Sequence, residues 1–405
     1  MNRLRLPCFP RLLPQALIAS AALVACGGGG GDSNSATGTL RLSLTDAPAC
    51  GYDNVWVTVE RVRVHQSGSA GDGDAGWSEV VLATPTRVDL LTLTNGTLMP
   101  LGQTALPAGS YNQMRLVLAA NTAANPLANA IKPTGGTETA LTTPSAQQSG
   151  LKMNVNIDVP AGQVADFAID FNACKSFVKA GNSGQYKLKP VLSVIPLLAN
   201  ASIVGYVDAS LANSGTTVAV QQGGVPVRAT PPDATGRFML YPVAVGNYDL
   251  VITAAGRVNA VMTGVPVTTT APTTLGSTTA RIDTPVSASS HAASGTITVN
   301  TSVAATGGAV RALQALTGGP TIEAGFVNAN DTTGAYSLLL PAGAPAKLAY
   351  AAGATAFAFA AAAADIAAPG RYTLEASATV GTGVVTKAPL AITLTAPVTT
   401  NFSFP

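Results

Sequence analysis

Short runs of alternating apolar and polar residues recur along the chain, and they constrain its fold more than any other feature. The runs from Leu40 to Leu44 and from Val55 to Val59 place leucine or valine at every second position. An alternation with period two is typical of half-buried β-strands. Similar runs follow at 114–118 and 153–159, and turn signals such as Asn95-Gly96 separate them. The pattern predicts an all-β protein made of tandem antiparallel β-sandwiches.

Length and charge narrow the classes of protein further. With 405 residues the chain is long enough for two to four domains. Only 10% of its residues are charged, against about a quarter in an average globular protein. Since the net charge is +2 and no basic cluster stands out, we expect no nucleic-acid partner.

The N-terminal residues have the features of an export signal. Arginines at positions 3, 5 and 11 precede an apolar stretch, Leu12 to Val24, that is too short to span a bilayer. The stretch ends in Leu23-Val24-Ala25-Cys26 and resembles a bacterial lipoprotein signal peptide. The resemblance implies cleavage of residues 1–25, a diacylglyceryl thioether on Cys26 and acylation of its new N-terminus. The alternative, a buried N-terminal helix, fits poorly with the glycines that follow at once.

The residues after Cys26 indicate where the anchor would hold the protein. In Gram-negative lipoproteins an aspartate after the lipidated cysteine retains the protein at the inner membrane, and here Gly27 takes that place. The resemblance therefore implies an outer-membrane lipoprotein, with either face of that membrane left open. Residues 26–37 are glycine and small polar residues, which is typical of a flexible tether.

Two cysteines remain once the signal peptide and the anchor are set aside. They are Cys50 and Cys174, and an oxidising envelope compartment favours a disulfide between them. On the chain-entropy model, closing a loop of this length contributes about 4–5 kcal/mol to stability.

Residues 38–198 form the first predicted domain. The segments Thr45-Asp46-Ala47-Pro48, Leu106-Pro107-Ala108-Gly109-Ser110-Tyr111 and Asp170 to Ser176 resemble the bacterial lipoprotein domain of unknown function 4382. The likeness extends over about 160 residues. It implies no chemistry, because that family has no established activity.

Residues 199–285 form the second predicted domain. Runs such as Ile203 to Val207, Gly236 to Leu240 and Gly246 to Val251 resemble the carboxypeptidase-regulatory-like, transthyretin-like sandwich. Alternation predicts that Phe238 and Leu240 face the core together.

Residues 286–405 repeat this pattern and predict a diverged further sandwich. Thr333 to Leu338 corresponds to Thr235 to Leu240, and Gly370 to Leu374 corresponds to Gly246 to Leu250. The segment Ala349 to Ala368 is ambiguous, since alanine favours a helix while Phe357 and Phe359 alternate as in a strand.

Motifs that could carry catalysis lack the required context. Residues 71–76 spell G-x-G-x-x-G, but a strand-like run follows where a dinucleotide site needs a helix, which predicts a mobile hairpin loop instead. Ser149 and Lys152 fit S-x-x-K, yet they open a predicted strand. The two histidines, His65 and His291, fall in different predicted domains. We therefore expect no enzyme and no required cofactor.

Two sets of residues are candidates for binding. Asp46, Asp53 and Asp170 would come together if Cys50 bonds to Cys174, and their hard oxygen ligands suit calcium. The alternative is that these aspartates cap turns.

Tyr206 and Tyr241 are the rings of the second predicted domain that could stack on a glycan, since alternation assigns Phe238 and Tyr248 to the core. Together these features predict a non-catalytic outer-membrane lipoprotein with a structural, adhesive or partner-binding role. Its lipid would bind the membrane. Its loops would bind a protein or a glycan, either in the envelope or outside the cell. The alternative is a carbohydrate-binding surface lipoprotein.

Overall fold

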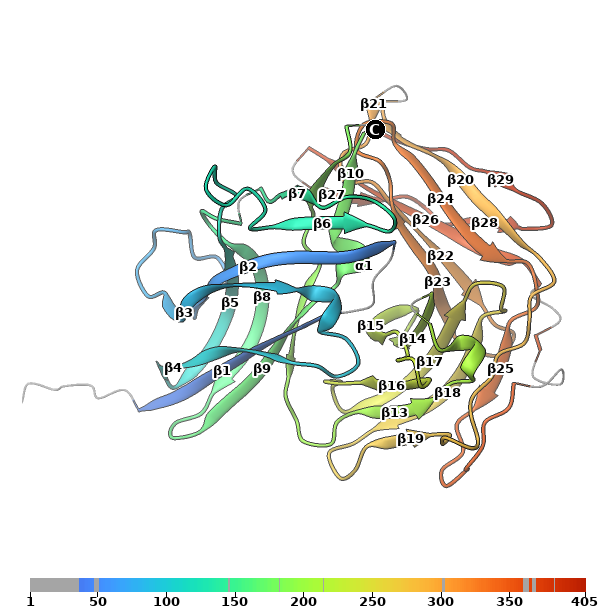
Figure 1. Cartoon of the computed structure of the whole chain (residues 1–405), viewed down its shortest axis with the longest axis horizontal. Coiled ribbons are helices and arrows are strands. Elements are labelled where there is room, and N and C mark those ends of the chain that lie inside the picture. Colours follow the sequence, from blue (N-terminus) through green and yellow to red (C-terminus); the bar gives the residue numbers. More distant parts are fainter. Residues whose placement is uncertain are drawn as a thin grey trace, which may run out of the picture. The chain divides into compact units, whose positions relative to one another are not determined.

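The computed structural model describes residues 36–46, 51–144, 146–181, 183–213, 215–300, 303–359, 364–365, 369–381 and 383–405. Within them the chain forms thirty β-strands, one α-helix of four residues and two 3-10 turns (Figure 1). No helix in this part of the chain is long and apolar enough to cross a membrane. The predicted all-β fold is confirmed.

The first sandwich, residues 36–196, has two sheets that share one core. The smaller sheet has the order β12-β9-β1-β4, with β1 (Thr37–Asp46), β4 (Met99–Pro107), β9 (Val164–Phe171) and β12 (Leu192–Pro196). The larger has the order β10-β11-β7-β6-β2-β5-β8 with β3 beside β2, and consists of β2 (Tyr52–His65), β3 (Ser78–Asp89), β5 (Gly109–Leu118), β6 (Ala130–Pro133), β7 (Thr139–Thr142), β8 (Leu151–Val159), β10 (Phe177–Ala180) and β11 (Gln185–Leu188). The 3-10 turn η1 (Leu90–Thr92) follows β3, and the helix α1 (Ala173–Ser176) joins β9 to β10.

The alternation predicted from the sequence fills this core. The leucines of β1 and the valines at 55, 57 and 59 of β2 are fully buried, while Trp56 lies on the other side of β2. Each such leucine or valine contributes about 1.5–3 kcal/mol by leaving water. The apolar stripe on each strand thus decides which face of each sheet turns inward.

The second sandwich has a three-stranded and a five-stranded sheet around its own core. The first has the order β16-β13-β19, with β13 (Ile203–Tyr206), β16 (Arg237–Leu240) and β19 (Thr273–Leu275). The second has the order β15-β14-β17-β18-β25, with β14 (Thr216–Gln222), β15 (Val225–Thr230), β17 (Gly246–Ala254), β18 (Ala260–Val267) and β25 (Ala346–Ala349). The 3-10 turn η2 (Ala209–Leu211) lies between β13 and β14. Phe238 and Leu240 are both fully buried, as predicted.

The third sandwich again pairs two sheets. In one, β20 (Ser290–Val299) lies beside β24 (Ala335–Pro341) and also pairs with β21 (Val303–Ala304), β29 (Val398–Thr399) and β30 (Phe402–Phe404). The other has the order β23-β22-β26-β27 with β28 beside β26, and consists of β22 (Ala309–Ala315), β23 (Thr321–Asn328), β26 (Arg371–Val380), β27 (Gly383–Thr386) and β28 (Leu390–Thr393).

Two features depart from the sequence-based prediction. The first is direction, since six strand pairings are parallel, among them β1 with β9. Short turns predict antiparallel neighbours, but these parallel pairs join strands that are distant in the sequence.

The second departure is β25, which lies within the predicted third domain and pairs in parallel with β18 of the second sandwich. The chain after it adds Phe357 and Phe359, only 4% and 6% exposed, to the second core. The domain boundary at residue 286 is therefore crossed, because these apolar rings are buried in the second sandwich. The described part of Ala349 to Ala368 forms no helix.

Candidate functional site

Contacts between the sandwiches are extensive, and residues Ala36–Pro405 form one compact unit. The predicted turn at Asn95-Gly96 is one example. Both residues have positive φ, and the Asn95 main-chain N donates to Thr230 Oγ1 at 2.8 Å. The Asn95 side chain accepts from the Met239 main-chain N at 2.5 Å. A turn of the first sandwich is thus fixed to the second.

A buried ion pair also joins the first and second sandwiches. Arg228 on β15 donates from Nη1 to Asp170 on β9, and their side chains are 1% and 7% exposed. Its Nη2 donates to Thr45 Oγ1 at 2.6 Å. Burial raises the pKa of Asp170, and the Arg228 charge opposes that rise. Removing either partner would leave a charge buried alone, so this pair couples the two sandwiches.

The second and third sandwiches meet through a side-chain amide. Gln221 on β14 donates from Nε2 to the main-chain O of Glu323 and accepts from its main-chain N, both at 2.8 Å. Both residues are buried. Apolar packing continues the contact in a small cluster of Val251, Val261, Leu316 and Ile322.

Helix α1 of the first sandwich contacts the third sandwich. Asn172 caps the helix by accepting from the Lys175 main-chain N at 3.1 Å. The Lys175 Nζ then donates to Glu323 Oε1 at 2.5 Å and lies 4.6 Å from the centre of the Phe326 ring. Arg311 lies 3.9 Å from the other oxygen of Glu323.

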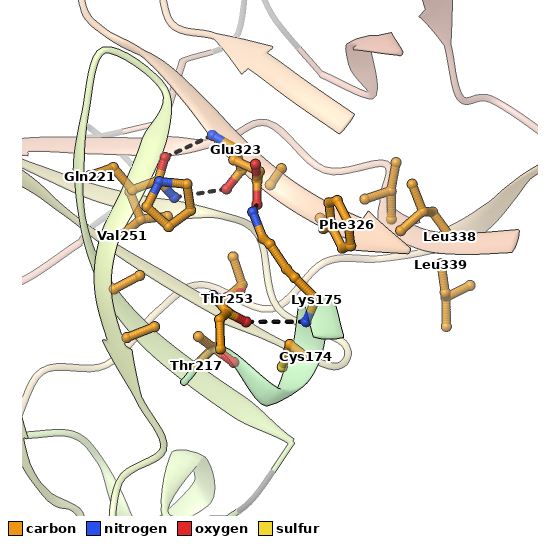
Figure 2. Close-up of a pocket in the computed structure, with 17 residues that line it drawn as sticks. Cys174, Lys175, Thr217, Gln221, Val251, Thr253, Glu323, Phe326, Leu338 and Leu339 are labelled. Carbon is orange, nitrogen blue, oxygen red and sulfur yellow. Dashed lines mark hydrogen bonds and ion pairs between the residues drawn. The ribbon is translucent and has the colours of Figure 1, made fainter. Parts of the chain in front are cut away.

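The Gln221–Glu323 and Lys175–Glu323 contacts border a cavity of about 240 Å³, which we call the junction cavity (Figure 2). The three sandwiches each supply part of its wall. Its lining comes from α1, from β14, β15 and β17, and from β23 and β24, and includes Lys175, Val251, Glu323, Phe326 and Leu338.

The charged groups of the junction cavity pair with each other. Lys175 and Glu323 line it and neutralise each other. Both hydrogen-bonding groups of the Gln221 amide are engaged by Glu323. No histidine is among the described lining residues.

The three aspartates predicted to hold calcium have other partners. Asp46 accepts from the Ala173 main-chain N at 3.0 Å, Asp53 lies 3.2 Å from Lys132 Nζ, and Asp170 pairs with Arg228. In the described ranges no group of three or more His, Cys, Asp or Glu side chains could hold a metal ion. Asp46 and Asp170 lie on neighbouring strands, whereas Asp53 lies on the other sheet.

The two tyrosines predicted for glycan binding are separate. Tyr206 lies on β13 opposite Arg237. Tyr241 follows β16 and lines an open cavity of about 690 Å³ together with Arg41 and Asp166. Burial, and then the charge of Asp166, raise the pKa of Tyr241. Tyr206 is not among the residues of that cavity.

The tryptophans offer no bare platform either. Arg87 covers the ring of Trp56 at 4.5 Å, and two further guanidinium groups lie within 4.7 Å of the Trp77 ring. Trp77 Nε1 also donates to the Gly71 main-chain O at 2.9 Å, which fastens the glycine-rich hairpin loop before β3.

The anchor and the disulfide stay predictions. Cys26 and Cys50 lie outside the described residues, and Cys174 lies in α1 on the wall of the junction cavity. Quantifying free thiols in the non-reduced, lipidated mature protein tests the bridge, which predicts none, because Cys26 would be a thioether; a free thiol at each of Cys50 and Cys174 would refute it.

Sequence reasoning missed Arg228, Lys175, Glu323 and Gln221. Each is a polar residue in a short run of apolar or small residues, a position that the alternation assigns to the solvent face. A weak signal was available for Arg228, since the flanking Val-Pro-Val and Ala make an isolated arginine costly unless it is paired.

The described chain is thus an array of three β-sandwiches that meet at a buried polar junction. Residues 37–190 match the family model described as "Domain of unknown function (DUF4382)", in agreement with the resemblance of the first domain. The match ends at residue 190, so the carboxypeptidase-regulatory-like resemblance of the second domain stays a prediction. No curated protein sequence is significantly similar to the chain.

Several solved structures share β-rich segments with the chain. A cohesin–X-dockerin complex from Acetivibrio cellulolyticus is 23% identical, with a TM-score of 0.18, over 22% of this chain and 58% of that one. The TIE protein of Bacillus anthracis is 9% identical, with a TM-score of 0.18, over 91% of this chain and 50% of the TIE chain. BcpA, the major pilin subunit of Bacillus cereus, is 10% identical, with a TM-score of 0.17, over 91% of this chain and 99% of the BcpA chain. The chain spans little more than half of the first and half of the second, and scores this low carry no argument about its function.

Proposed function

We propose that this protein is a non-catalytic lipoprotein of the bacterial outer membrane that presents a stiff array of β-sandwiches to a partner in the envelope or outside it. The observation that carries the proposal is the junction, where buried polar groups of three sandwiches satisfy one another. In a flexible string of domains such groups would be exposed to water.

The energetics of the junction support a structural or adhesive role. Separating the sandwiches would break the Arg228–Asp170 pair and the two hydrogen bonds of Gln221, all of which are buried. A buried group that loses its partner costs about 1–3 kcal/mol, and a buried charge costs more. The array therefore resists bending, which suits a protein that holds a partner at a distance from a membrane.

The membrane anchor rests on the sequence around Cys26. Fractionation of cells that express the wild-type chain and Cys26→Ala tests it, with Cys8→Ala as a matched control because that cysteine leaves with the signal peptide. We expect the wild type and Cys8→Ala in the outer membrane, and Cys26→Ala released or retained unprocessed. Equal amounts of all three in the soluble periplasmic fraction would refute the anchor.

Glycan binding is the second candidate, and Tyr241 is the observation that favours it. This half-buried ring lies in an open cavity beside Arg41 and Asp166, a combination of stacking surface and polar groups that suits a sugar. A glycan array probed with the mature chain tests the idea. Saturable binding that is lost in Tyr241→Ala but kept in Tyr206→Ala would place a sugar at this cavity.

A further inference from the structure

The third sandwich presents the edges of two sheets at the junction cavity. In the described part of the chain β23 pairs only with β22, and β24 pairs only with β20. Both strands contribute consecutive residues to the cavity wall, Glu323 to Phe326 from one and Leu338 to Leu340 from the other. Side chains alternate between the faces of a strand, so consecutive residues line a cavity only where it runs along the strand edge.

The edge of β23 is already occupied. Gln221 donates to the main-chain O of Glu323 and accepts from its main-chain N, which are the two hydrogen bonds that a neighbouring strand would make. This amide therefore closes β23 at the cavity.

The hydrogen bonds that flank β24 show which of its groups face outward. The Ala342 main-chain N donates to Ser289 O at 2.9 Å, and Gly334 O accepts from Ile297 N at 2.8 Å. In an antiparallel pair the hydrogen-bonded positions alternate. Even-numbered residues of β24 therefore bond to β20, and odd-numbered residues direct their main-chain N–H and C=O away from it.

The two ends of that outward row are taken. The main-chain O of Ala335 accepts from Asn330 N at 2.9 Å, and the main-chain O of Pro341 accepts from the Tyr372 hydroxyl at 2.7 Å. Both are odd-numbered, as the alternation requires. Between them stand Ser337 and Leu339, whose outward main-chain groups have no hydrogen-bond partner among the described residues.

The two residues of the open edge are accessible to solvent. Ser337 is exposed and the Leu339 side chain is 70% exposed. In Figure 2, Leu338 and Leu339 lie next to Phe326, at the end of the cavity lining opposite Gln221 and Val251. An exposed, unpaired strand edge is a template for another extended chain.

We infer that the edge of β24 at Ser337 and Leu339 binds a short extended peptide segment of a partner protein by β-strand addition. The four outward main-chain groups of these residues specify a strand as the occupant. The segment inserts an uncharged aliphatic side chain into the junction cavity, because Lys175 and Glu323 neutralise each other and leave no charge for a ligand to balance. The inference rests on the partner-binding role proposed above and specifies how the partner is bound.

A heptapeptide library tests this mode with the mature full-length chain. Selected peptides are expected to carry aliphatic residues at alternate positions and to slow hydrogen exchange at the amides of Ser337 and Leu339. Leu339→Pro removes one outward N–H without removing a bond to β20 and is expected to weaken peptide binding about tenfold. Leu339→Thr keeps the N–H and is the matched control, expected to retain most of the affinity.

The proposal would be overturned if Leu339→Pro bound the peptides as tightly as the wild type with an unchanged melting temperature. It would also be overturned if the peptides slowed hydrogen exchange only in other strands. Concentration-dependent dimerisation that protects the same two amides would also overturn it, because the occupant would then be a second copy. An anchored protein that crosslinks to envelope proteins while the library returns no binder would leave the proposed function standing and refute this edge as its site.

Discussion

Replacing either partner of the Arg228–Asp170 pair should uncouple the first two sandwiches. Arg228→Met leaves the Asp170 carboxylate in a buried site, and Asp170→Leu leaves the guanidinium there. Breaking a buried pair in this way costs about 3–5 kcal/mol, whereas replacing both partners by apolar residues is often neutral or stabilising. We therefore expect each single variant to lose about 3–5 kcal/mol and the double variant to recover most of it. Thr45 keeps two acceptors, Leu93 O and Thr97 O, when Arg228 is absent.

Urea unfolding followed by tryptophan fluorescence measures this effect where it arises, since Trp56 and Trp77 both lie in the first sandwich. A loss of this size should lower the urea midpoint by about 1 M or more. The matched control is Arg41→Met, in which Asp166 on β9, the strand that also carries Asp170, loses its partner Arg41 on β1. There the side chains of Arg41 and Asp166 are 52% and 22% exposed. An exposed pair contributes little to stability, so we expect Arg41→Met to leave the urea midpoint almost unchanged.

The pH dependence gives a second readout. Burial raises the pKa of Asp170 above its value in the unfolded chain, so the folded state binds this proton more tightly than the unfolded state and loses stability as pH rises through the raised pKa. Without Arg228 the pKa of Asp170 is raised further. The free energy of unfolding that Arg228→Met loses relative to the wild type should therefore become smaller as pH falls. A double variant as unstable as the sum of the two single variants, or an Arg41→Met deficit equal to that of Arg228→Met, would refute the reasoning.

Three further predictions follow from the contacts between sandwiches and from one buried ring. A fragment of residues 199–285 lacks β25, Phe357 and Phe359, and should remain unfolded by circular dichroism, whereas 199–405 should fold. Gln221→Leu leaves two main-chain groups of Glu323 unpaired and should cost about 2–4 kcal/mol in urea unfolding, while the exposed Gln222→Leu should cost almost nothing. Burial raises the pKa of Tyr52 to about 12, so stability should fall as pH rises from about 10 toward 12, and Tyr52 should ionise late in an alkaline absorbance titration.

The fold was largely predictable from the sequence, and the junction was not. Alternation of Leu40, Leu42 and Leu44 is a local signal, and burial on one face of β1 follows directly from it. The parallel pairing of β1 with β9 was not accessible in this way, because local patterns carry no information about which distant strand lies alongside.

The site residues were hidden for a related reason. Arg228 meets Asp170 across 58 residues, and Lys175 meets Glu323 across 148. In isolation each looks like a solvated surface residue, and only the packing of one sandwich on another buries it. The predicted aspartates are not gathered into one group in the structure, where Asp170 is paired with Arg228 and Asp53 with Lys132.

The passage of β25 into the second sandwich has a consequence for the order in which the chain can mature. A chain that emerges N-terminus first has every strand of its first sandwich by residue 196, and that unit can close early. The five-stranded sheet of the second sandwich must wait for residues 346–349, and its core for Phe359. During that interval the outer edge of β18 and part of an apolar core stay uncovered. Residues 201–359 therefore mature as one long, late step, and the factors that guard newly exported chains would be needed most over this stretch.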